Sequence, residues 1–249
     1  EHADLATPER RRITLAHLLT MTVGLAWDES GSYLRPDNSE TRMRFALDPV
    51  RHVLERDIVA EPGSRFVYNS GATLLLGEVI TRATGRPLDV VARDWLFAPL
   101  GIERTEWRRA RDQVTPFGGL RLRPRDLARI GRMLLDGGQW QGRQLVPAPW
   151  IDASFQPHVP TGSGELRYGY QWWRGAFTWG PRRVGWVAAM GNGGRRMFLL
   201  PELDLVVVVT AGNYNQPDSW RAPMQVFGSV AAEVGKREDA AGARVRVEP

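Results

Sequence analysis

The spacing of apolar residues changes near residue 160, and this change limits the possible fold more than any other feature of the sequence. Before it, apolar side chains recur every three or four residues, which is the spacing of helices that bury one face. After it, short β-branched and aromatic runs are separated by glycine, proline and asparagine, as in strands joined by turns. Helices followed by strands predict an α+β fold.

The first part of the chain predicts a mainly helical subdomain over residues 1–160. Expected helices cover residues 14–23, 40–46, 48–55, the stretch from Ser70 to Gly85, 87–99 and 124–135. Gly85 is the expected stop of its helix, because glycine adopts the left-handed backbone that ends many helices. The polar, glycine-containing segment Trp27–Asn38 is interpreted as a loop.

The second part predicts an antiparallel sheet and a closing helix over residues 161–235. Strands are expected at Tyr168–Trp173, Arg183–Ala189, Arg196–Leu200 and Leu205–Thr210, and a helix at Ala222–Val234. Val206–Val209 is apolar at every position, which favours a strand covered on both faces. Residues 236–249 are predicted to form a charged tail.

Composition excludes several classes of protein and of site. The 249 residues are 43% hydrophobic and 24% charged, as in folded domains, and contain no cysteine for a disulfide or a thiolate nucleophile. No apolar run is long enough to span a membrane. The net charge of +5 comes from arginines interleaved with acids, without a nucleic-acid-binding motif, so no nucleic-acid partner is expected.

Familiar catalytic motifs are also missing from the sequence. It has no G-x-S-x-G, P-loop, HExxH or complete GxGxxG motif, and its four histidines lack metal-ligand spacing. We therefore expect no metal and no organic cofactor. A Ser-His-Asp triad stays open, because its members meet only in space. Of the 33 basic residues only Lys236 is a lysine, so any mechanism in this chain that needs a lysine depends on it.

Two short segments stand out as candidates for chemistry. Phe66–Gly71 places Tyr68, Asn69 and Ser70 at the start of an apolar helix, where Asn69 or Ser70 could simply be the N-cap. Gly191–Gly194 lies between two expected strands, where a hairpin turn is the structural explanation.

Taken together and in order, several segments resemble the serine β-lactamase and penicillin-binding-protein-like family. Ile13–Leu25 resembles its ITxxHLLxxTSGL helix, and Glu61–Ser70 its PGxxFxY stretch. Further similar segments, collinear over about residues 10–235, are Leu75–Leu100, Gly118–Gly142, Met190–Gly194 and Leu203–Asn213. The resemblance implies a helical subdomain beside an antiparallel sheet flanked by helices, with the family's opening strands missing here.

The resemblance also implies roles for individual residues. Tyr68 matches the catalytic tyrosine that relays protons, and Asn192-Gly193-Gly194 matches the third motif that lines the acyl site. The backbone amide of Arg195 would be one oxyanion donor. Asn69 and Ser70, together with the third motif, would contact the substrate. We therefore expect Gly191–Arg196 to lie within reach of Tyr68.

Two departures from the family pattern bear on the substrate. The usual Y-x-N appears as Tyr68-Asn69-Ser70, so a hydroxyl replaces the orienting amide, or the amide is displaced by one residue. The third motif begins with Asn192 where the family has lysine or histidine, a cation that helps to bind β-lactam carboxylates. This favours an esterase or amidase over a β-lactamase.

A third departure concerns the nucleophile. The family uses S-x-x-K, but no serine here precedes a lysine by three residues. We expect this chain to be the C-terminal portion of a longer hydrolase, inactive alone and poorly folded, since missing strands leave a sheet edge exposed. The resemblance suggests a periplasmic or secreted protein, although the sequence leaves a cytoplasmic one open.

The predicted function is hydrolysis of a small ester, amide or peptide-like substrate through an acyl-enzyme. The alternative is a non-catalytic module of the same fold that binds peptidoglycan or a partner protein. Its binding surface would use tryptophans that core packing explains equally well, namely Trp172, Trp173, Trp179 and Trp186.

Overall fold

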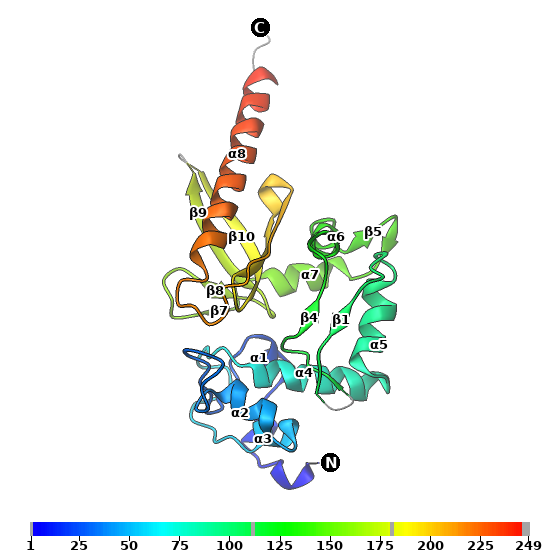
Figure 1. Ribbon diagram of the computed structural model, residues 1–249, viewed down its shortest axis with the longest axis vertical. Coiled ribbons are helices and arrows are strands. Elements are labelled where there is room, and N and C mark those ends of the chain that lie inside the picture. Colours follow the sequence, from blue (N-terminus) through cyan, green and yellow to red (C-terminus); the bar gives the residue numbers. More distant parts are fainter. Residues whose placement is uncertain (1, 111–112, 180–181, 246–249) are drawn as a thin grey trace.

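The computed structural model describes residues 2–110, 113–179 and 182–245 and shows an α+β fold (Figure 1). A helical region holds the N-terminal half, and an antiparallel sheet with helices on its faces holds the C-terminal half, as predicted. None of the described helices is long and apolar enough to cross a membrane.

Most expected helices begin and end within two residues of the expected positions, but the one expected over residues 14–23 ends at Leu19. The helices are α1 (Leu15–Leu19), α2 (Ser39–Phe45), α3 (Pro49–Leu54), α4 (Ser70–Thr84), α5 (Leu88–Ala92) with a π-helical continuation (Arg93–Phe97), α6 (Pro124–Leu135), α7 (Ala148–Phe155) and α8 (Arg221–Val245). Side-chain oxygens of Thr14, Asn38, Asp48 and Asn69 cap the first four. Gly85 ends α4 with φ = 66°, as predicted for a left-handed stop.

The main sheet has six antiparallel strands in the order β12-β11-β10-β9-β8-β7. Their bounds are β7 (Val159–Pro160), β8 (Arg167–Tyr168), β9 (Trp173–Trp179), β10 (Arg182–Gly191), β11 (Arg195–Leu200) and β12 (Leu205–Val209). Three two-residue pairs lie outside it: β1 (Glu106–Trp107) with β4 (Leu120–Arg121), β2 (Arg109–Ala110) with β3 (Gln113–Val114), and β5 (Gln139–Trp140) with β6 (Arg143–Gln144).

Strand β11 is buried on both of its faces. Phe198 packs in the cluster formed with α8, where its ring stacks on Phe227 with centroids 4.0 Å apart. Met197 and Leu199 face the opposite way, toward α6. Alternate residues of β12 divide between the same two clusters, so the prediction that Val206–Val209 is covered on both faces is confirmed.

The structure corrects the expected strand Tyr168–Trp173. Strand β8 ends at Tyr168 and β9 begins at Trp173, with a turn between them in which Gln171 has φ = 64°. The side-chain amide of Gln171 donates to the carbonyl oxygens of Leu18 and Leu19, at 3.2 and 3.3 Å. The turn therefore ties the sheet to the end of α1.

Two other expectations were incomplete. Helix α7 was not predicted, although Pro149 lies in its first turn, where proline is favoured. The charged tail predicted over residues 236–249 was wrong in its first ten residues, because α8 continues to Val245. The last four residues lie outside the described part of the chain. Lysine, arginine, glutamate and alanine, which are common there, are strong helix formers.

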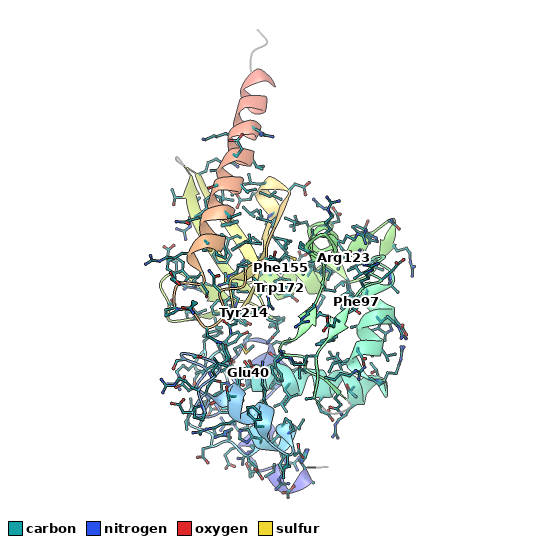
Figure 2. All side chains as sticks on the ribbon, in the orientation of Figure 1. Glu40, Phe97, Arg123, Phe155, Trp172 and Tyr214 are labelled. Carbon is teal, nitrogen blue, oxygen red and sulfur yellow. The ribbon has the colours of Figure 1, made fainter. Side chains whose placement is uncertain are left out.

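The sheet and the helical region meet around two aromatic contacts. Phe66, just before α4, lies against Tyr168 and Trp173 of the sheet, with ring centroids 5.1 and 5.8 Å apart. In Figure 2, Phe155 of α7 lies beside Trp172, and the two rings meet edge to face at 5.4 Å. The contacts of Phe66 hold the start of α4 against the sheet, and the contact of Phe155 holds the end of α7 against the turn before β9.

Candidate active site

Tyr68 lies directly before α4, in a position that the fold holds firmly. The next residue, Asn69, is fully buried, and its Oδ1 accepts a hydrogen bond from the backbone N–H of Ala72 at 2.9 Å. Asn69 is therefore the N-cap, one of the two alternatives expected. The ring of Tyr68 stacks on Trp173, with centroids 5.8 Å apart.

The surroundings of Tyr68 favour its neutral phenol. Burial, with the negative charges of Glu29 and Glu40 nearby, raises the pKa of Tyr68 to about 12. A tyrosine in this state holds its proton. A nearby cation would be needed before it could lose the proton near neutral pH.

Ser70, the first residue of α4, is bound by a carboxylate rather than open to solvent. Its backbone N–H donates to Oε1 of Glu29 at 2.5 Å, and its hydroxyl donates to Oε2 of the same residue at 2.9 Å. Ser70 is only 4% exposed. The hydroxyl is thus already engaged in the described structure.

The amide nitrogen of Asn69 is the unpaired polar atom at this helix start. Its Nδ2 is buried and has no hydrogen-bond partner within the described residues, while Oδ1 serves the cap. A buried donor without an acceptor is costly. Nδ2 is therefore the atom through which Asn69 could contact a substrate or another segment.

The third motif forms the turn between β10 and β11. Asn192 and Asn215 are joined twice: Nδ2 of Asn192 donates to Oδ1 of Asn215, and the backbone N–H of Asn215 donates to Oδ1 of Asn192, both at 3.1 Å. Gly193 and Gly194 both have φ = 83°, which favours glycine. The carboxamide that replaces the family's cation is therefore used to hold the 213–216 turn.

Arg195 opens β11 opposite Gly191. Its guanidinium lies over the ring of Tyr214, 4.6 Å from the centroid. The side chain thus packs on the same turn that Asn192 holds, and the predicted role of Arg195 concerns its backbone amide only.

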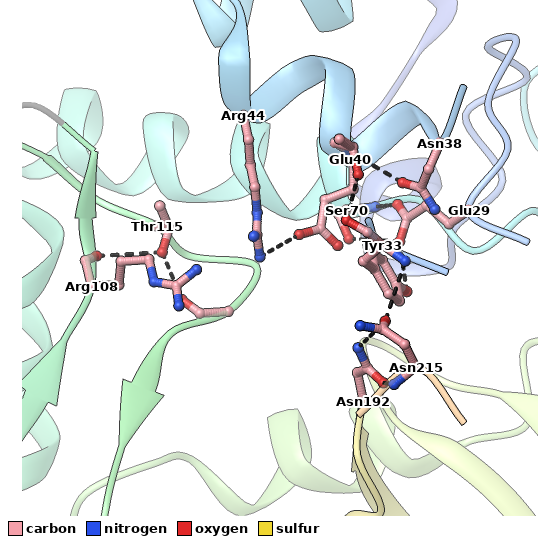
Figure 3. Close-up of polar contacts among 12 residues, drawn as sticks. Glu29, Tyr33, Asn38, Glu40, Arg44, Ser70, Arg108, Thr115, Asn192 and Asn215 are labelled. Atoms are coloured by element: carbon pink, nitrogen blue, oxygen red, sulfur yellow. Dashed lines mark hydrogen bonds and ion pairs between the residues drawn. The ribbon is translucent and has the colours of Figure 1, made fainter. Parts of the chain in front are cut away.

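Tyr33 links the third motif to the start of α4 (Figure 3). Its backbone N–H donates to Oδ1 of Asn215 at 3.2 Å, and its hydroxyl donates to Oε2 of Glu29 at 3.2 Å. A chain of hydrogen bonds therefore runs from Asn192 through Asn215, Tyr33 and Glu29 to Ser70. Segments more than 100 residues apart in sequence are joined in this way.

Sequence reasoning missed three residues of this network, Glu29, Tyr33 and Asn215, and the nearby buried Glu40. Glu40 is 6% exposed, pairs with Arg44 at 2.7 Å, and has its pKa raised to about 7, chiefly by burial. The available signal was weak, because acidic and aromatic residues in a polar loop are common. Only folding brings these residues together with Tyr68–Ser70, which we call the tyrosine motif.

The tryptophans proposed as a binding surface are used in packing wherever they are described. Trp186 is 3% exposed in the core under α8. Trp172 packs against Phe155, and Trp173 packs against Tyr68. The side chain of Trp179 lies outside the described residues. Within the described part of the chain, no three histidine, aspartate or glutamate side chains gather as metal ligands.

Replacing Gly193 with alanine is expected to destabilise the third motif. A Cβ atom there would lie 2.8 Å from Cδ1 of Tyr214, and the positive φ is strained for alanine. We expect the free energy of unfolding of the full gene product to fall by about 1–3 kcal/mol, measured by urea denaturation. Gly212→Ala is the matched control, because a Cβ atom there meets nothing within 4 Å. Equal effects of the two changes would contradict the close approach.

Comparison with known proteins gives one family and several relatives. The sequence profile of the Beta-lactamase family matches residues 1–225. A 6-aminohexanoate-dimer hydrolase of Paenarthrobacter ureafaciens is 31% identical over 169 residues, which cover 62% of this chain and 41% of that protein. This chain therefore spans less than half of that relative.

Solved structures share the fold. One described as "Putative 6-aminohexanoate-dimer hydrolase from Bacillus anthracis" has a TM-score of 0.78 and 23% identity, covering 94% of this chain and 64% of that one. EstCE1, a hydrolase with promiscuous acyltransferase activity, has a TM-score of 0.71 and 18% identity, covering 88% and 71%. At these identities the likeness concerns the fold alone.

Proposed function

The chain belongs to the beta-lactamase family, and we propose that it forms most of the acyl-transfer site of a serine hydrolase that cleaves an ester or amide bond. The observation that carries the proposal is the hydrogen-bond chain from Asn192 to Ser70. It holds the third motif and the tyrosine motif in one network. The two segments that match catalytic motifs are thus connected to each other by hydrogen bonds.

The serine nucleophile and its lysine come from a segment outside these 249 residues. No serine of the chain precedes a lysine by three residues, and the residue three before Lys236 is Glu233. The chain also spans 41% and 64% of the two hydrolase relatives described above. A segment outside these residues would account both for the absent serine–lysine pair and for the part of the relatives that this chain does not cover.

Tyr68 moves the proton during acyl transfer. The serine oxygen bonds to the substrate carbonyl carbon and passes its proton to the oxygen of Tyr68, while Tyr68 passes a proton to the amine or alcohol, which leaves as its bond to the carbonyl carbon breaks. Water then attacks the carbonyl carbon of the acyl-enzyme, and the same proton transfers release the acid and restore the serine. A phenol with its pKa raised to about 12 stays protonated near neutral pH and gives up its proton only to a strongly basic group, such as the leaving amine or alcohol as its bond to carbon breaks. The lysine cation would supply the positive charge that lets it accept a proton in turn.

The turn that follows β10 holds the substrate carbonyl. The backbone amide of Arg195 is one donor to the oxyanion, and the small Gly193 and Gly194 allow the substrate to approach the strand. Asn69 contributes its unpaired Nδ2. Ser70 acts in the site through Glu29, because its hydroxyl already donates to that carboxylate.

Esters and linear amides are expected to be better substrates than penicillins. Asn192 stands where the family has a cation, and its neutral carboxamide is bonded to Asn215, so it offers no positive charge to a β-lactam carboxylate. We expect the full gene product to turn over p-nitrophenyl esters or simple amides faster than nitrocefin, measured as kcat/KM in parallel assays. The relative named as 6-aminohexanoate-dimer hydrolase makes a linear amide the first to test.

Two results would revise this proposal. Fast nitrocefin hydrolysis without esterase or amidase activity would reverse the order of substrates. Absence of all hydrolysis, with tight binding of peptidoglycan fragments, would favour the non-catalytic module instead.

A further inference from the structure

The carboxylate of Glu29 accepts four hydrogen bonds from the protein itself. Oε1 accepts from the backbone N–H of Ser70 and from Nε1 of Trp27, both at 2.5 Å. Oε2 accepts from the hydroxyls of Ser70 and Tyr33, at 2.9 and 3.2 Å. Four donors fill the acceptor positions of a carboxylate. The side chain therefore acts within the protein and is not left to contact a ligand.

The four donors come from two separate parts of the chain. Trp27 and Tyr33 belong to the segment 27–38, which contains no helix or strand, whereas Ser70 begins α4. The ends of this segment are held by the backbone bond from Ala26 to Asp57 and by the bonds between Asp28 and Ser39. Between these ends, Glu29 bonds the segment to the tyrosine motif.

The same segment holds the third motif from its other side. The backbone N–H of Tyr33 donates to Asn215, and Asn215 makes two hydrogen bonds with Asn192 (Figure 3). If Tyr33 shifts, Oδ1 of Asn215 loses this donor and keeps the bond from Nδ2 of Asn192. Glu29, through the Tyr33 hydroxyl, therefore helps to set the position of the turn at Asn192.

We propose that Glu29 is a positioning residue: it fastens the 27–38 segment to Ser70 at the start of α4 and, through Tyr33 and Asn215, holds the third motif in the same hydrogen-bonded network. The proposal rests on the acyl-transfer function proposed above. It predicts that kcat depends on the geometry of the Glu29 side chain and not on its charge. Glutamine keeps that geometry, because its Oε1 can still accept from Trp27 and Ser70 N–H groups, and its Nε2 can donate to either hydroxyl, which then turns to accept.

The test compares Glu29→Ala, Glu29→Gln and Glu55→Ala in the full gene product. Glu55 is a matched control, an exposed glutamate bonded to Arg51 on α3. We expect Glu29→Ala to lower kcat about 100-fold with little change in KM, as for a misplaced catalytic group. Glu29→Gln should recover most of that rate with an unchanged pH profile, and Glu55→Ala should match the wild type.

Three outcomes would overturn the proposal. Wild-type kcat in Glu29→Ala would show that the segment needs no fastening. A glutamine variant as slow as the alanine variant, with one limb of the pH profile lost, would make Glu29 a proton carrier. If Glu29→Ala fails to fold, Asn215→Ala removes the same link from the other side, and wild-type kcat in that variant would equally refute the proposal.

A second measurement keeps this inference separate from the proposed function. Hydrogen exchange of residues 211–217 should accelerate in Glu29→Ala and stay unchanged in Glu55→Ala, even if no substrate is turned over. Faster exchange without any hydrolysis would support the positioning role and refute the hydrolase. Unchanged exchange in an active hydrolase would refute the positioning role alone.

Discussion

Replacing Tyr68 with phenylalanine is expected to lower kcat for ester hydrolysis by the full gene product about 10²–10⁴-fold, the usual contribution of a positioned proton-transfer group. The change removes one oxygen and leaves the ring stacked on Trp173, so the fold should survive. KM should change little, because the hydroxyl acts on the proton and not on substrate affinity. Steady-state kinetics with a p-nitrophenyl ester measures both constants.

Tyr170→Phe is the control for this change. Tyr170 lies in the turn between β8 and β9, where its ring stacks on His158 with centroids 4.1 Å apart. It should keep wild-type kcat. Equal activity of the two variants would remove Tyr68 from the mechanism and with it the main support for the proposed function.

A fluorophosphonate probe is expected to label the full gene product once, at a serine outside residues 1–249. Within the chain no serine has a lysine three residues later, and Ser70 is 4% exposed with its hydroxyl bonded to Glu29. The purified 249-residue chain should therefore carry no adduct. Intact mass followed by peptide mapping measures both the stoichiometry and the position.

An adduct on a serine of this chain would contradict the prediction. If it mapped to Ser70, the Glu29 carboxylate would be the base for a nucleophile that no sequence motif predicted. If it mapped elsewhere in the chain, a Ser-His-Asp arrangement left open by the sequence would be the next explanation to test.

Local signals predicted much of the fold correctly. The N-cap, narrowed by the sequence to Asn69 or Ser70, and the stop at Gly85 depend on hydrogen bonds and backbone angles within a few residues, which sequence patterns record well. The two-sided burial of Val206–Val209 follows from composition alone. By contrast, the break between β8 and β9 falls at Gln171. This residue has a positive φ although it is not a glycine, so the sequence does not indicate the turn.

The candidate site was only half predictable for a physical reason. Tyr68 and Asn192–Gly194 lie in motifs whose residues are adjacent in sequence, so a resemblance to a family finds them. Glu29 and Tyr33 act through hydrogen bonds across 41 and 182 residues, respectively. Such contacts exist only after folding, and a polar loop gives no periodic pattern from which to infer them.

The two-sided burial of β11 also bears on how this protein could acquire new specificities. A slip of one residue would exchange Met197 for Phe198 on the face toward α6, where Gly131 approaches the sheet so closely that a Cβ atom would lie 2.6 Å from Val206. The strand therefore cannot change its register. In the turn that β11 anchors, Gly193 and Gly194 have φ = 83° and favour glycine, but the exposed side chain of Asn192 can change without moving the strand. For directed evolution, a library confined to Asn192 would explore chemistry while the strand preserves the fold.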